Sequence, residues 1–277
     1  MTSGIHLSVV SHGHGHLVPA LLNDLREHCA KEDLRLTLTV NDGSPMGIHP
    51  ASFPFPIEVV VNKTPRGFSA NHNAAFARWP RLPYFCVVNP DIRLHADPFA
   101  ALRRAVGEEP TLGVVAPLVE DPDGRLEDSA RRLPTPWSIL GKALGVGWGP
   151  QYRFGRGRQP VDWLAGMFMF FPSPVFTRLN GFDDRHFLYY EDVNICCRLQ
   201  LAGYVALVEP AVRVVHQARR ASHRDPKHLY WHLASMLRFF TSPLFARCWW
   251  RLRVRCVEAA SRRRPADDWS DRPGAPL

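Results

Sequence analysis

The chain has 277 residues, of which 45% are hydrophobic and 22% charged, a globular composition that argues against a disordered chain. Its 34 Lys and Arg against 26 Asp and Glu leave a net charge of +8. Seven Arg and one Glu between residues 247 and 264 supply six of these charges, so the basic patch is local. A protein that coats nucleic acid over its whole surface is excluded.

The cysteines and the apolar runs indicate the compartment. None of the six Cys forms a C-x-x-C pair, which argues against a structural zinc site and a disulfide framework. The N-terminus becomes polar within ten residues, so no signal peptide is predicted. The longest apolar run, 163–171, is shorter than the roughly 18 residues of a membrane-spanning helix. We therefore expect a reduced, cytosolic compartment.

The first half of the chain alternates between short apolar runs and amphipathic stretches. Strands are expected at 5–10, 34–40, 57–61, 84–88 and 112–116, and helices at 17–31, 69–77 and 98–106. This alternation predicts βαβ units that pack a largely parallel sheet between helices.

The second half has a less regular pattern. Residues 133–160 carry many Pro and Gly without a steady period, which is typical of a functional lid or a mobile loop. The later elements expected are a buried run at 163–171, a helix at 191–202, strands at 205–208 and 212–215, and an aromatic, Arg-rich helical region at 227–264. The tail after Arg264 is expected to be disordered.

Polar residues follow several expected strands, where ligands bind in open α/β sheets. These positions are Asn41-Asp42, Asn89-Pro90-Asp91 and His216. Asn-Pro-Asp also makes turns for local reasons, but Asp91 is a hard oxygen donor suited to Mg²⁺ or Mn²⁺. His216 is either a metal ligand or a satisfied polar group. The alternating His12, His14 and His16 invite a zinc interpretation, yet adjacent glycines favour a flexible loop.

The carboxylates Glu191 and Asp192 open an expected helix. Acidic residues in a first turn also complement the helix dipole, which is the simpler explanation. The preceding aromatic stretch 187–190 would shield the pair from water, however. Desolvation and a like-charged neighbour both raise a carboxyl pKa, which favours a proton-accepting base.

These segments occur in one order, and together they resemble the family 2 inverting glycosyltransferases of the GT-A fold, especially the bacterial rhamnosyltransferase-like branch. The resemblance covers about residues 5–240. It rests on Asn41-Asp42-Gly43-Ser44, Gly67-Phe68-Ser69-x-Asn71-x-Asn73, Val87-Val88-Asn89-Pro90-Asp91, Trp163-Leu164-Ala165-Gly166, Gly181-Phe182-Asp183, Phe187-x-Tyr189-x-Glu191-Asp192-Val193-Asn194-x-Cys196-x-Arg198, Gly203-Tyr204 and His216.

The resemblance implies a role for each catalytic and metal-binding candidate. Asp91 matches the family's metal-binding aspartate, which holds a divalent cation, Mg²⁺ or Mn²⁺, against the donor pyrophosphate. His216 matches a histidine that completes the metal shell. Asp192 matches the base that deprotonates the acceptor hydroxyl, with Glu191 beside it.

The resemblance also implies a donor site. Its residues are Val10, Ser11, Asn41 and Asp42 at the nucleotide base, and Gly67, Phe68, Asn71, Asn73 and Asn89 along the donor pocket. Two positions depart from the family pattern. Asn41 stands where the family usually has Asp; its oxygen can still accept from a pyrimidine N3–H, or Asp42 takes the role after a small shift. Pro65 stands where an Asn is usual, two residues before Gly67.

The fold class implied is α/β, a GT-A (Rossmann-like) domain with a mostly parallel central sheet flanked by helices and a C-terminal helical extension. The domain would span 1–242, with a nucleotide-sugar half at about 1–118 and an acceptor half at about 119–242. A basic aromatic segment, 243–264, and a tail, 265–277, would follow.

The expected activity is inverting, metal-dependent transfer of a sugar, with rhamnose as a candidate, from a nucleoside-diphosphate sugar to a hydroxyl of a surface-polysaccharide or lipid-linked glycan acceptor. The alternatives are another nucleotide-sugar-handling α/β enzyme and a basic nucleic-acid-binding module. The sequence contains neither a G-x-x-x-x-G-K phosphate loop nor a G-x-G-x-x-G turn, which argues against another nucleotide-binding α/β enzyme. Nucleic acid is not an expected partner.

Aromatic residues beside a run of Arg predict contact between 243–264 and an anionic membrane surface. The enzyme would then be cytoplasmic and peripheral on the inner face of a bacterial inner membrane, serving cell-envelope polysaccharide synthesis. In the alternative, the aromatic rings pack on the domain and the Arg face is merely solvated. Pro243 is expected to interrupt the helix.

Overall fold

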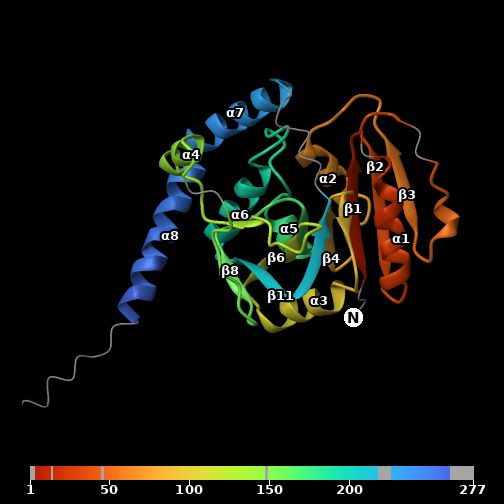
Figure 1. Cartoon of the computed structure of the whole chain (residues 1–277), viewed down its shortest axis with the longest axis horizontal. Coiled ribbons are helices and arrows are strands. Elements are labelled where there is room, and N and C mark those ends of the chain that lie inside the picture. Colours follow the sequence, from red (N-terminus) through yellow and green to blue (C-terminus); the bar gives the residue numbers. More distant parts are fainter. Residues whose placement is uncertain (1–3, 14, 45–46, 147–148, 218–225, 263–277) are drawn as a thin grey trace, which may run out of the picture.

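The computed structural model describes residues 4–13, 15–44, 47–146, 149–217 and 226–262 (Figure 1). The strands are β1 (Ile5–Ser11), β2 (Leu34–Val40), β3 (Ile57–Val61), β4 (Tyr84–Val88), β5 (Ile92–Arg93), β6 (Leu112–Glu120), β7 (Ala130–Arg131), β8 (Gln159–Val161), β9 (Trp163–Leu164), β10 (Phe168–Pro172) and β11 (Val205–His216). The helices are α1 (Val18–His28), α2 (Phe68–Phe76), α3 (Phe99–Glu108), α4 (Pro136–Ala143), α5 (Ser173–Arg178), α6 (Glu191–Leu201), α7 (Pro226–Phe240) and α8 (Pro243–Arg262), with a 3₁₀ turn, η1 (Pro50–Ser52). The tail expected at 265–277 lies outside the described residues.

Within this described part, nine strands form one sheet in the order β3-β2-β1-β4-β10-β6-β11-β5, with β8 paired to β11. β3, β2, β1 and β4 pair in parallel, as do β6 and β11. β10 lies between β4 and β6 and runs antiparallel to both. β4 and β6 therefore run in the same direction, and so do the strands that pair with them in parallel. The predicted α/β fold with a mostly parallel sheet flanked by helices is confirmed.

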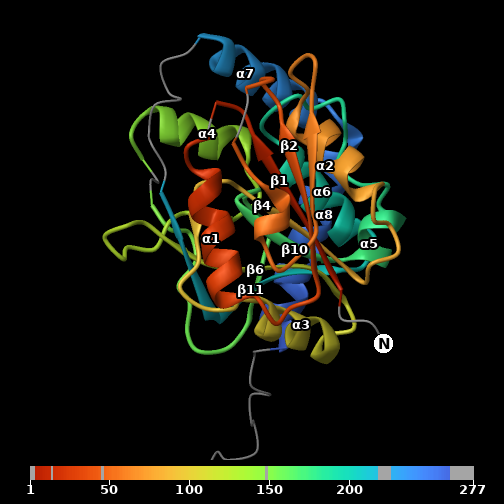
Figure 2. The same ribbon diagram turned by 90° about the vertical axis from the view of Figure 1, so that its right-hand side faces the viewer.

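The two faces of the sheet bury different sets of side chains. Alternate residues of β1 face opposite sides because strand side chains have a period of two. Ile5, Leu7 and Val9 pack with α1 and α3, whereas β4 and β10 bury Phe85 and Phe171 toward α2, α5 and α6. Figure 2 shows α1 on one side of the sheet and α2, α5 and α6 on the other.

Three expectations about the second half need correction. Residues 133–160 contain helix α4, which Thr135 caps by accepting from the Ser138 N–H, with Pro136 at its first position. The two strands expected after residue 205 are one strand, β11, with a bulge between Glu209 and Arg213. The buried run 163–171 is divided by a turn into β9 and β10.

The C-terminal helices pack on the second face. The chain turns at Thr241-Ser242, and Pro243 begins α8, as expected of a residue that lacks an N–H. Cys248 of α8 and Cys197 of α6 are both buried in the same core cluster. No helix of the described residues is long and apolar enough to cross a membrane.

Candidate functional site

A cavity of about 650 Å³ opens at the carboxyl ends of β1, β2 and β4. Its lining combines residues from both halves of the chain and from α7: Val10, His12, Asn41, Pro65, Arg66, Phe68, Asn71, Asn89, Pro90, Asp91, Ala165, Gly166, Met167, Phe187, Leu188, Tyr189, Glu191, Asp192, Lys227, His228 and Trp231. This is the sheet edge at which the sequence places its polar clusters.

One wall of this cavity, here called the amide wall, is a network of Asn41, Asn62, Asn71 and the Arg66 backbone. The Asn62 side-chain N–H donates to the Oδ1 of Asn41 at 2.7 Å and of Asn71 at 2.8 Å. The Arg66 N–H also donates to the Asn41 Oδ1 at 2.9 Å. Because two donors already occupy this oxygen, the Asn41 amide fixes the wall and has no lone pair left for a nucleotide base.

The neighbours of Asn41 point elsewhere. Ser11 is buried at the end of β1 and does not line the cavity. Asp42 is exposed, and its carboxylate accepts the N–H groups of Gly13 at 2.8 Å and Ser44 at 3.1 Å. Val10 and Asn41 therefore lie at the cavity, whereas Ser11 and Asp42 lie behind and beside it.

Gly67 allows the two halves of the chain to approach each other. A Cβ at this position would stand 2.6 Å from the Phe187 carbonyl oxygen, too close for any side chain. The Phe68 N–H donates to the same oxygen at 2.8 Å. Gly67 does not line the cavity but sets its width, and Phe68 lies on its wall.

Asn73 is not a cavity residue. Its side chain donates to the Phe182 carbonyl at 2.8 Å and to Asp184 Oδ1 at 2.6 Å, and its own Oδ1 accepts the Phe182 N–H. It lines a separate surface cavity of about 600 Å³ beside α5. Asn73 therefore anchors the loop at 181–184, while the expected donor contact at this position has no geometric support.

Asp91 and His216 meet because β5 pairs with the end of β11. The His216 Nε2 lies 3.2 Å from Asp91 Oδ2, and its Nδ1 lies 2.8 Å from Glu127 Oε2. Burial opposes charge on this imidazole, but the two carboxylates outweigh it and raise the pKa of His216 to about 9. Glu127 comes from the segment after β6, which the sequence did not single out.

The donor set at this point suits a hard divalent cation. Carboxylate oxygens are ligands of Mg²⁺ and Mn²⁺, and the imidazole would join them only after a cation displaced its proton. A carboxylate on the far nitrogen of a metal-binding His is the usual orienting partner, and Glu127 holds that position. Among the described residues, no group of three or more His, Cys, Asp or Glu has the arrangement of a complete metal site.

The opposite wall, here called the carboxylate wall, consists of Glu191 and Asp192 at the start of α6. Asp192 accepts the N–H groups of Val193 at 2.8 Å and Gly166 at 3.2 Å. Glu191 is only 5% exposed, and its Oε2 has no hydrogen-bond partner. Both side chains line the cavity.

The surroundings of the two carboxyl groups shift their pKa values by different means. Burial and the adjacent Asp192 raise the pKa of Glu191 well above its usual range. Burial also raises the pKa of Asp192, but the Val193 N–H and the Arg131 guanidinium oppose that rise. Hydrogen bonds to a carboxylate stabilise its charged form. Asp192 is therefore the better candidate for an ionised base, and Glu191 the better candidate for a protonated acid.

The backbone that presents this pair is strained. Tyr189 and Tyr190 have φ of 70° and 64°, a left-handed conformation that is costly for bulky residues. Helix α7 packs over them: the Tyr189 hydroxyl and His228 share a hydrogen bond at 3.0 Å, and the Ser235 hydroxyl donates to the Leu188 carbonyl at 3.0 Å. Packing on α7 therefore stabilises the conformation that directs the carboxyls into the cavity.

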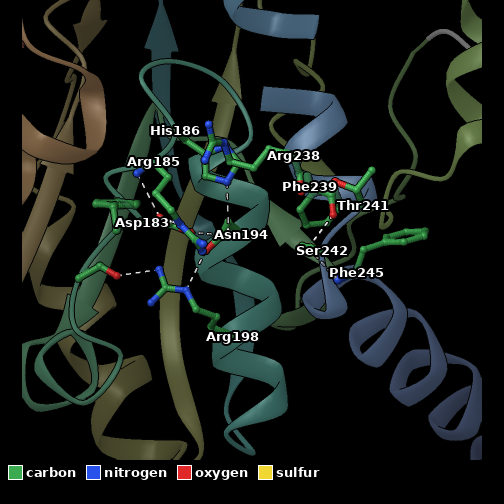
Figure 3. Close-up of polar contacts among 12 residues, drawn as sticks. Asp183, Arg185, His186, Asn194, Arg198, Arg238, Phe239, Thr241, Ser242 and Phe245 are labelled. Carbon is green, nitrogen blue, oxygen red and sulfur yellow. Dashed lines mark hydrogen bonds and ion pairs between the residues drawn. The ribbon is translucent and has the colours of Figure 1, made fainter. Parts of the chain in front are cut away.

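A second set of contacts holds the loop before the pair (Figure 3). The Arg198 guanidinium donates to Asn194 Oδ1 at 2.8 Å, to the Gly181 carbonyl at 2.7 Å, and to the Leu179 carbonyl. His186, buried beside Asn194, faces the same helix. Arg198 and Asn194 of the quoted motif thus organise the loop that leads to Glu191 without lining the cavity.

Sequence comparison with known proteins gives matches over most of the chain. An N-acetylglucosaminyl-diphospho-decaprenol L-rhamnosyltransferase of Mycobacterium tuberculosis is 32% identical over 182 residues, which cover 61% of this chain and 58% of that protein. The rhamnosyltransferase WbbL of Escherichia coli K12 is 28% identical over 263 residues, covering 85% of this chain and 92% of WbbL. The match spans little more than half of the mycobacterial relative. No protein-family model matches the chain.

Solved structures share the fold at low sequence identity. TarS of Staphylococcus aureus, in complex with UDP, has a TM-score of 0.61 at 12% identity and covers 90% of this chain and 68% of its own. The mannosyltransferase PcManGT of Pyrobaculum calidifontis, in complex with GDP-Man and Mn²⁺, has a TM-score of 0.55 at 17% identity, covering 94% and 76%. These similarities identify the GT-A fold.

Proposed function

We propose that this chain transfers a sugar from a nucleoside-diphosphate sugar to an acceptor hydroxyl, with inversion at the anomeric carbon. It has the GT-A fold and is related to the rhamnosyltransferase-like branch of glycosyltransferase family 2. One observation carries the proposal. A cavity at the carboxyl ends of the parallel strands is lined both by Asp91 and by the perturbed pair Glu191 and Asp192.

The donor would lie against the amide wall. The backbone and side-chain amide groups of this wall are uncharged hydrogen-bond donors and acceptors. Such groups suit the uncharged base and ribose of a nucleoside. Val10 and Phe68 supply apolar surface beside Asn71 and Asn89. Because the Asn41 oxygen is filled, we expect the base contact to come from backbone atoms at the end of β1 and from residues 62–66.

The acceptor would lie against the carboxylate wall. Asp192 removes the proton of the acceptor hydroxyl while its oxygen attacks the anomeric carbon, and the bond to the nucleoside diphosphate breaks on the opposite face. Single displacement inverts the anomeric configuration. Glu191 stays protonated and donates a hydrogen bond to a substrate hydroxyl, which satisfies its buried oxygen.

A divalent cation would be held by Asp91 and His216, with the remaining ligands supplied by the donor diphosphate. When bound, such a cation stabilises negative charge on the leaving nucleoside diphosphate. Asp91 would supply the charged oxygen, and Glu127 would orient the His216 ring. PcManGT has been solved with Mn²⁺, which makes Mn²⁺ the first ion to test.

The relatives suggest the substrate class. Their names specify rhamnosyl transfer, and the mycobacterial one specifies a decaprenol-diphosphate-linked N-acetylglucosamine acceptor. We propose rhamnose as the transferred sugar, a lipid-linked glycan of the cell envelope as the acceptor, and the cytoplasmic face of the membrane as the location.

Thermal stabilisation tests the donor site directly, because a ligand that binds only the native state raises the melting temperature. Uridine, thymidine and guanosine diphosphates and their sugars would be screened with Mn²⁺, Mg²⁺ or EDTA. We expect a pyrimidine nucleotide to stabilise the chain in the presence of Mn²⁺ and more weakly in EDTA. No stabilisation by any nucleotide would exclude the proposed function.

The Asp91→Asn variant distinguishes cation binding from nucleotide binding. Asn keeps the size of Asp91 but loses its charge, so we expect the Mn²⁺-dependent part of the stabilisation and the transfer of sugar to disappear. A variant, or a wild-type sample in EDTA, that transfers sugar at the normal rate would contradict the metal role.

A further inference from the structure

We infer that α4 and α7 together form a surface that inserts into an anionic lipid bilayer beside the opening of the cavity. This surface, here called the apolar ridge, consists of the exposed residues Trp137, Leu140, Leu144, Val146, Leu229, Tyr230, Leu233 and Leu237. The inference deepens the proposed function, because it assigns the partner that would deliver a lipid-linked acceptor.

Exposure on the ridge is high for such residues. Trp137 is 80% exposed, Leu144 74% and Tyr230 69%. Among the described residues, most of the exposed large hydrophobic side chains fall within these two short segments. Exposed apolar residues gathered on two helices in this way indicate an interaction site rather than ordinary solvent-exposed surface.

Each helix presents these residues on one face. In α4, Trp137, Leu140 and Leu144 follow a spacing of three and four, while Ile139 packs against the core. In α7, Leu229, Leu233 and Leu237 are four residues apart. The other face of α7 carries the buried Ser235 and Phe239. Both helices are therefore fixed to the domain on one side and bare on the other.

The two helices lie at the same end of the molecule in both views (Figures 1 and 2). That end also holds the cavity, because Lys227, His228 and Trp231 of α7 line it. On the other side, Lys142 of α4 lies 3.7 Å from Asp128, whose carboxylate also pairs with Arg131 at 2.9 Å. These ion pairs at Asp128 hold α4 beside β7.

Charge identifies the bilayer as anionic. Within the two ridge helices the charged residues are all basic: Lys142 in α4, and Lys227 and Arg238 in α7. An anionic bilayer matches both properties of the ridge, because it has an apolar interior beneath a negatively charged surface. Trp and Tyr prefer the membrane interface, and each basic residue near an anionic surface strengthens binding.

The inference places the membrane contact on α4 and α7, whereas the sequence pattern indicated residues 243–264. In α8, Leu244, Phe245, Trp249 and Leu252 pack against the core, and Arg253 stacks over Trp249 at 4.0 Å. Trp250 alone remains strongly exposed among the large hydrophobic residues described in that helix. Removing α8 after Ser242 would uncover the buried Cys197, so the test uses substitutions in the full-length chain.

The experiment measures co-sedimentation of the full-length protein with vesicles of phosphatidylcholine and phosphatidylglycerol in equal parts, and with pure phosphatidylcholine. We expect binding to the anionic vesicles at low salt. The pairs Trp137→Ser with Leu140→Ser, and Leu233→Ser with Leu237→Ser, should each weaken it about ten-fold. The matched control, Val59→Thr with Val61→Thr, changes exposed residues on the distant strand β3 and should leave binding unchanged.

Brominated lipids provide a second readout. They should quench the tryptophan fluorescence of the wild type, and the Trp137→Phe variant should lose part of that quenching, because Trp137 enters the acyl boundary. Quenching that is identical in the two proteins would overturn the inference for α4.

Other results would overturn the inference in different ways. If only Arg247→Gln with Arg251→Gln weakens vesicle binding, α8 is the anchor and the ridge is not. If size-exclusion chromatography shows a dimer that the ridge variants dissociate, the ridge is an interface between two copies.

Nucleotide stabilisation of the same variants separates this inference from the proposed function. Intact vesicle binding without nucleotide binding would defeat the proposed function alone. Nucleotide binding without vesicle binding would defeat the ridge alone.

Discussion

The two walls of the cavity differ in how they are held in place. The amide wall is neutral, and Asn41, Asn62 and Asn71 satisfy one another by hydrogen bonds. The carboxylate wall carries two perturbed acids on a left-handed backbone at Tyr189 and Tyr190. A network without charge or strain suits binding, whereas strain and shifted pKa values are typical of the place where a proton moves.

The two walls also depend on different parts of the chain. The carboxylate wall depends on α7, which is far along the chain and meets the wall through Tyr189, His228 and Ser235. In the amide wall, the side-chain hydrogen bonds of Asn41, Asn62 and Asn71 stay within residues 41–71. Changes in the carboxylate wall should therefore act on turnover, and changes in the amide wall should act on donor affinity.

The largest expected effect comes from Asp192→Asn. Asn keeps the shape and can still accept the Val193 N–H, but it cannot take a proton at neutral pH. Turnover should fall by roughly 10²–10⁴-fold. The donor melting-temperature shift should stay unchanged, because Asp192 serves the acceptor.

The matched variant Glu191→Gln keeps a hydrogen-bond donor where we expect a protonated acid, so it should lose much less turnover. Steady-state kinetics with a soluble acceptor analogue measures both variants. If Glu191→Gln abolishes activity and Asp192→Asn does not, the roles of the pair are reversed.

A smaller effect is expected from Glu127→Gln, which tests the orienting contact to the His216 Nδ1. Loss of such a carboxylate typically lowers metal affinity by about 10–100-fold. Titration of Mn²⁺ by electron paramagnetic resonance measures this affinity without turnover. Glu120→Gln is the control, since Glu120 pairs with Arg213 on the surface nearby. Equal Mn²⁺ affinity in both variants would mean that Glu127 does not orient His216.

Gly67→Ala tests the point where the two walls approach each other. The new Cβ would meet the Phe187 carbonyl at 2.6 Å, and that carbonyl belongs to backbone that cannot rotate away. We expect a loss of about 1–3 kcal/mol in the free energy of unfolding, as for other overpacked sites. Both donor affinity and turnover should fall, because one loop serves both walls.

Gly107→Ala is the control for this substitution, because a Cβ there meets nothing within 4 Å in helix α3. Ala is the better helix former, so this variant should be as stable as the wild type or more so. Chemical denaturation followed by circular dichroism compares the two. If Gly67→Ala unfolds like the wild type, the close approach at Phe187 is not needed.

The sequence predicted what local pattern determines. The apolar runs from β1 to β6 and the polar residues at their ends follow from period and position, so Asn41, Asn89 and Asp91 were placed at one edge. Helix α4 was missed although Thr135 and Pro136 are ordinary start signals, because the surrounding Gly and Pro outweighed them.

The contacts that the sequence did not predict join residues far apart in the chain. Glu127 reaches His216 across 89 positions, and Asn62 joins Asn41 to Asn71 through side-chain amides. Nothing in the spacing of these residues indicates such pairs, because the pairing depends on how β5, β7 and β11 pack. Asn73 shows the reverse case, in which a motif position serves the loop at 182–184 instead of the cavity.

The smallest expected effect concerns pH and the histidines under the amide wall. His6 and His72 are buried between β1, β2 and α2, where His6 pairs with Thr37 and His72 with Ser8. Burial lowers the pKa of His6 to about 4 and of His72 to about 3, so both stay neutral in the folded protein.

In the unfolded chain each of these histidines binds a proton below about pH 6.5. Since the unfolded state then holds more protons, stability falls as the pH decreases from 6.5 toward 4, by on the order of 1–2 kcal/mol per histidine between pH 7 and pH 5. Urea unfolding at both pH values should show a smaller difference for His6→Gln than for the wild type. His49→Gln, at an exposed position, should keep the full difference. If His6→Gln keeps it too, burial of this imidazole is not what weakens the fold in acid, and His72 remains as the buried imidazole to test.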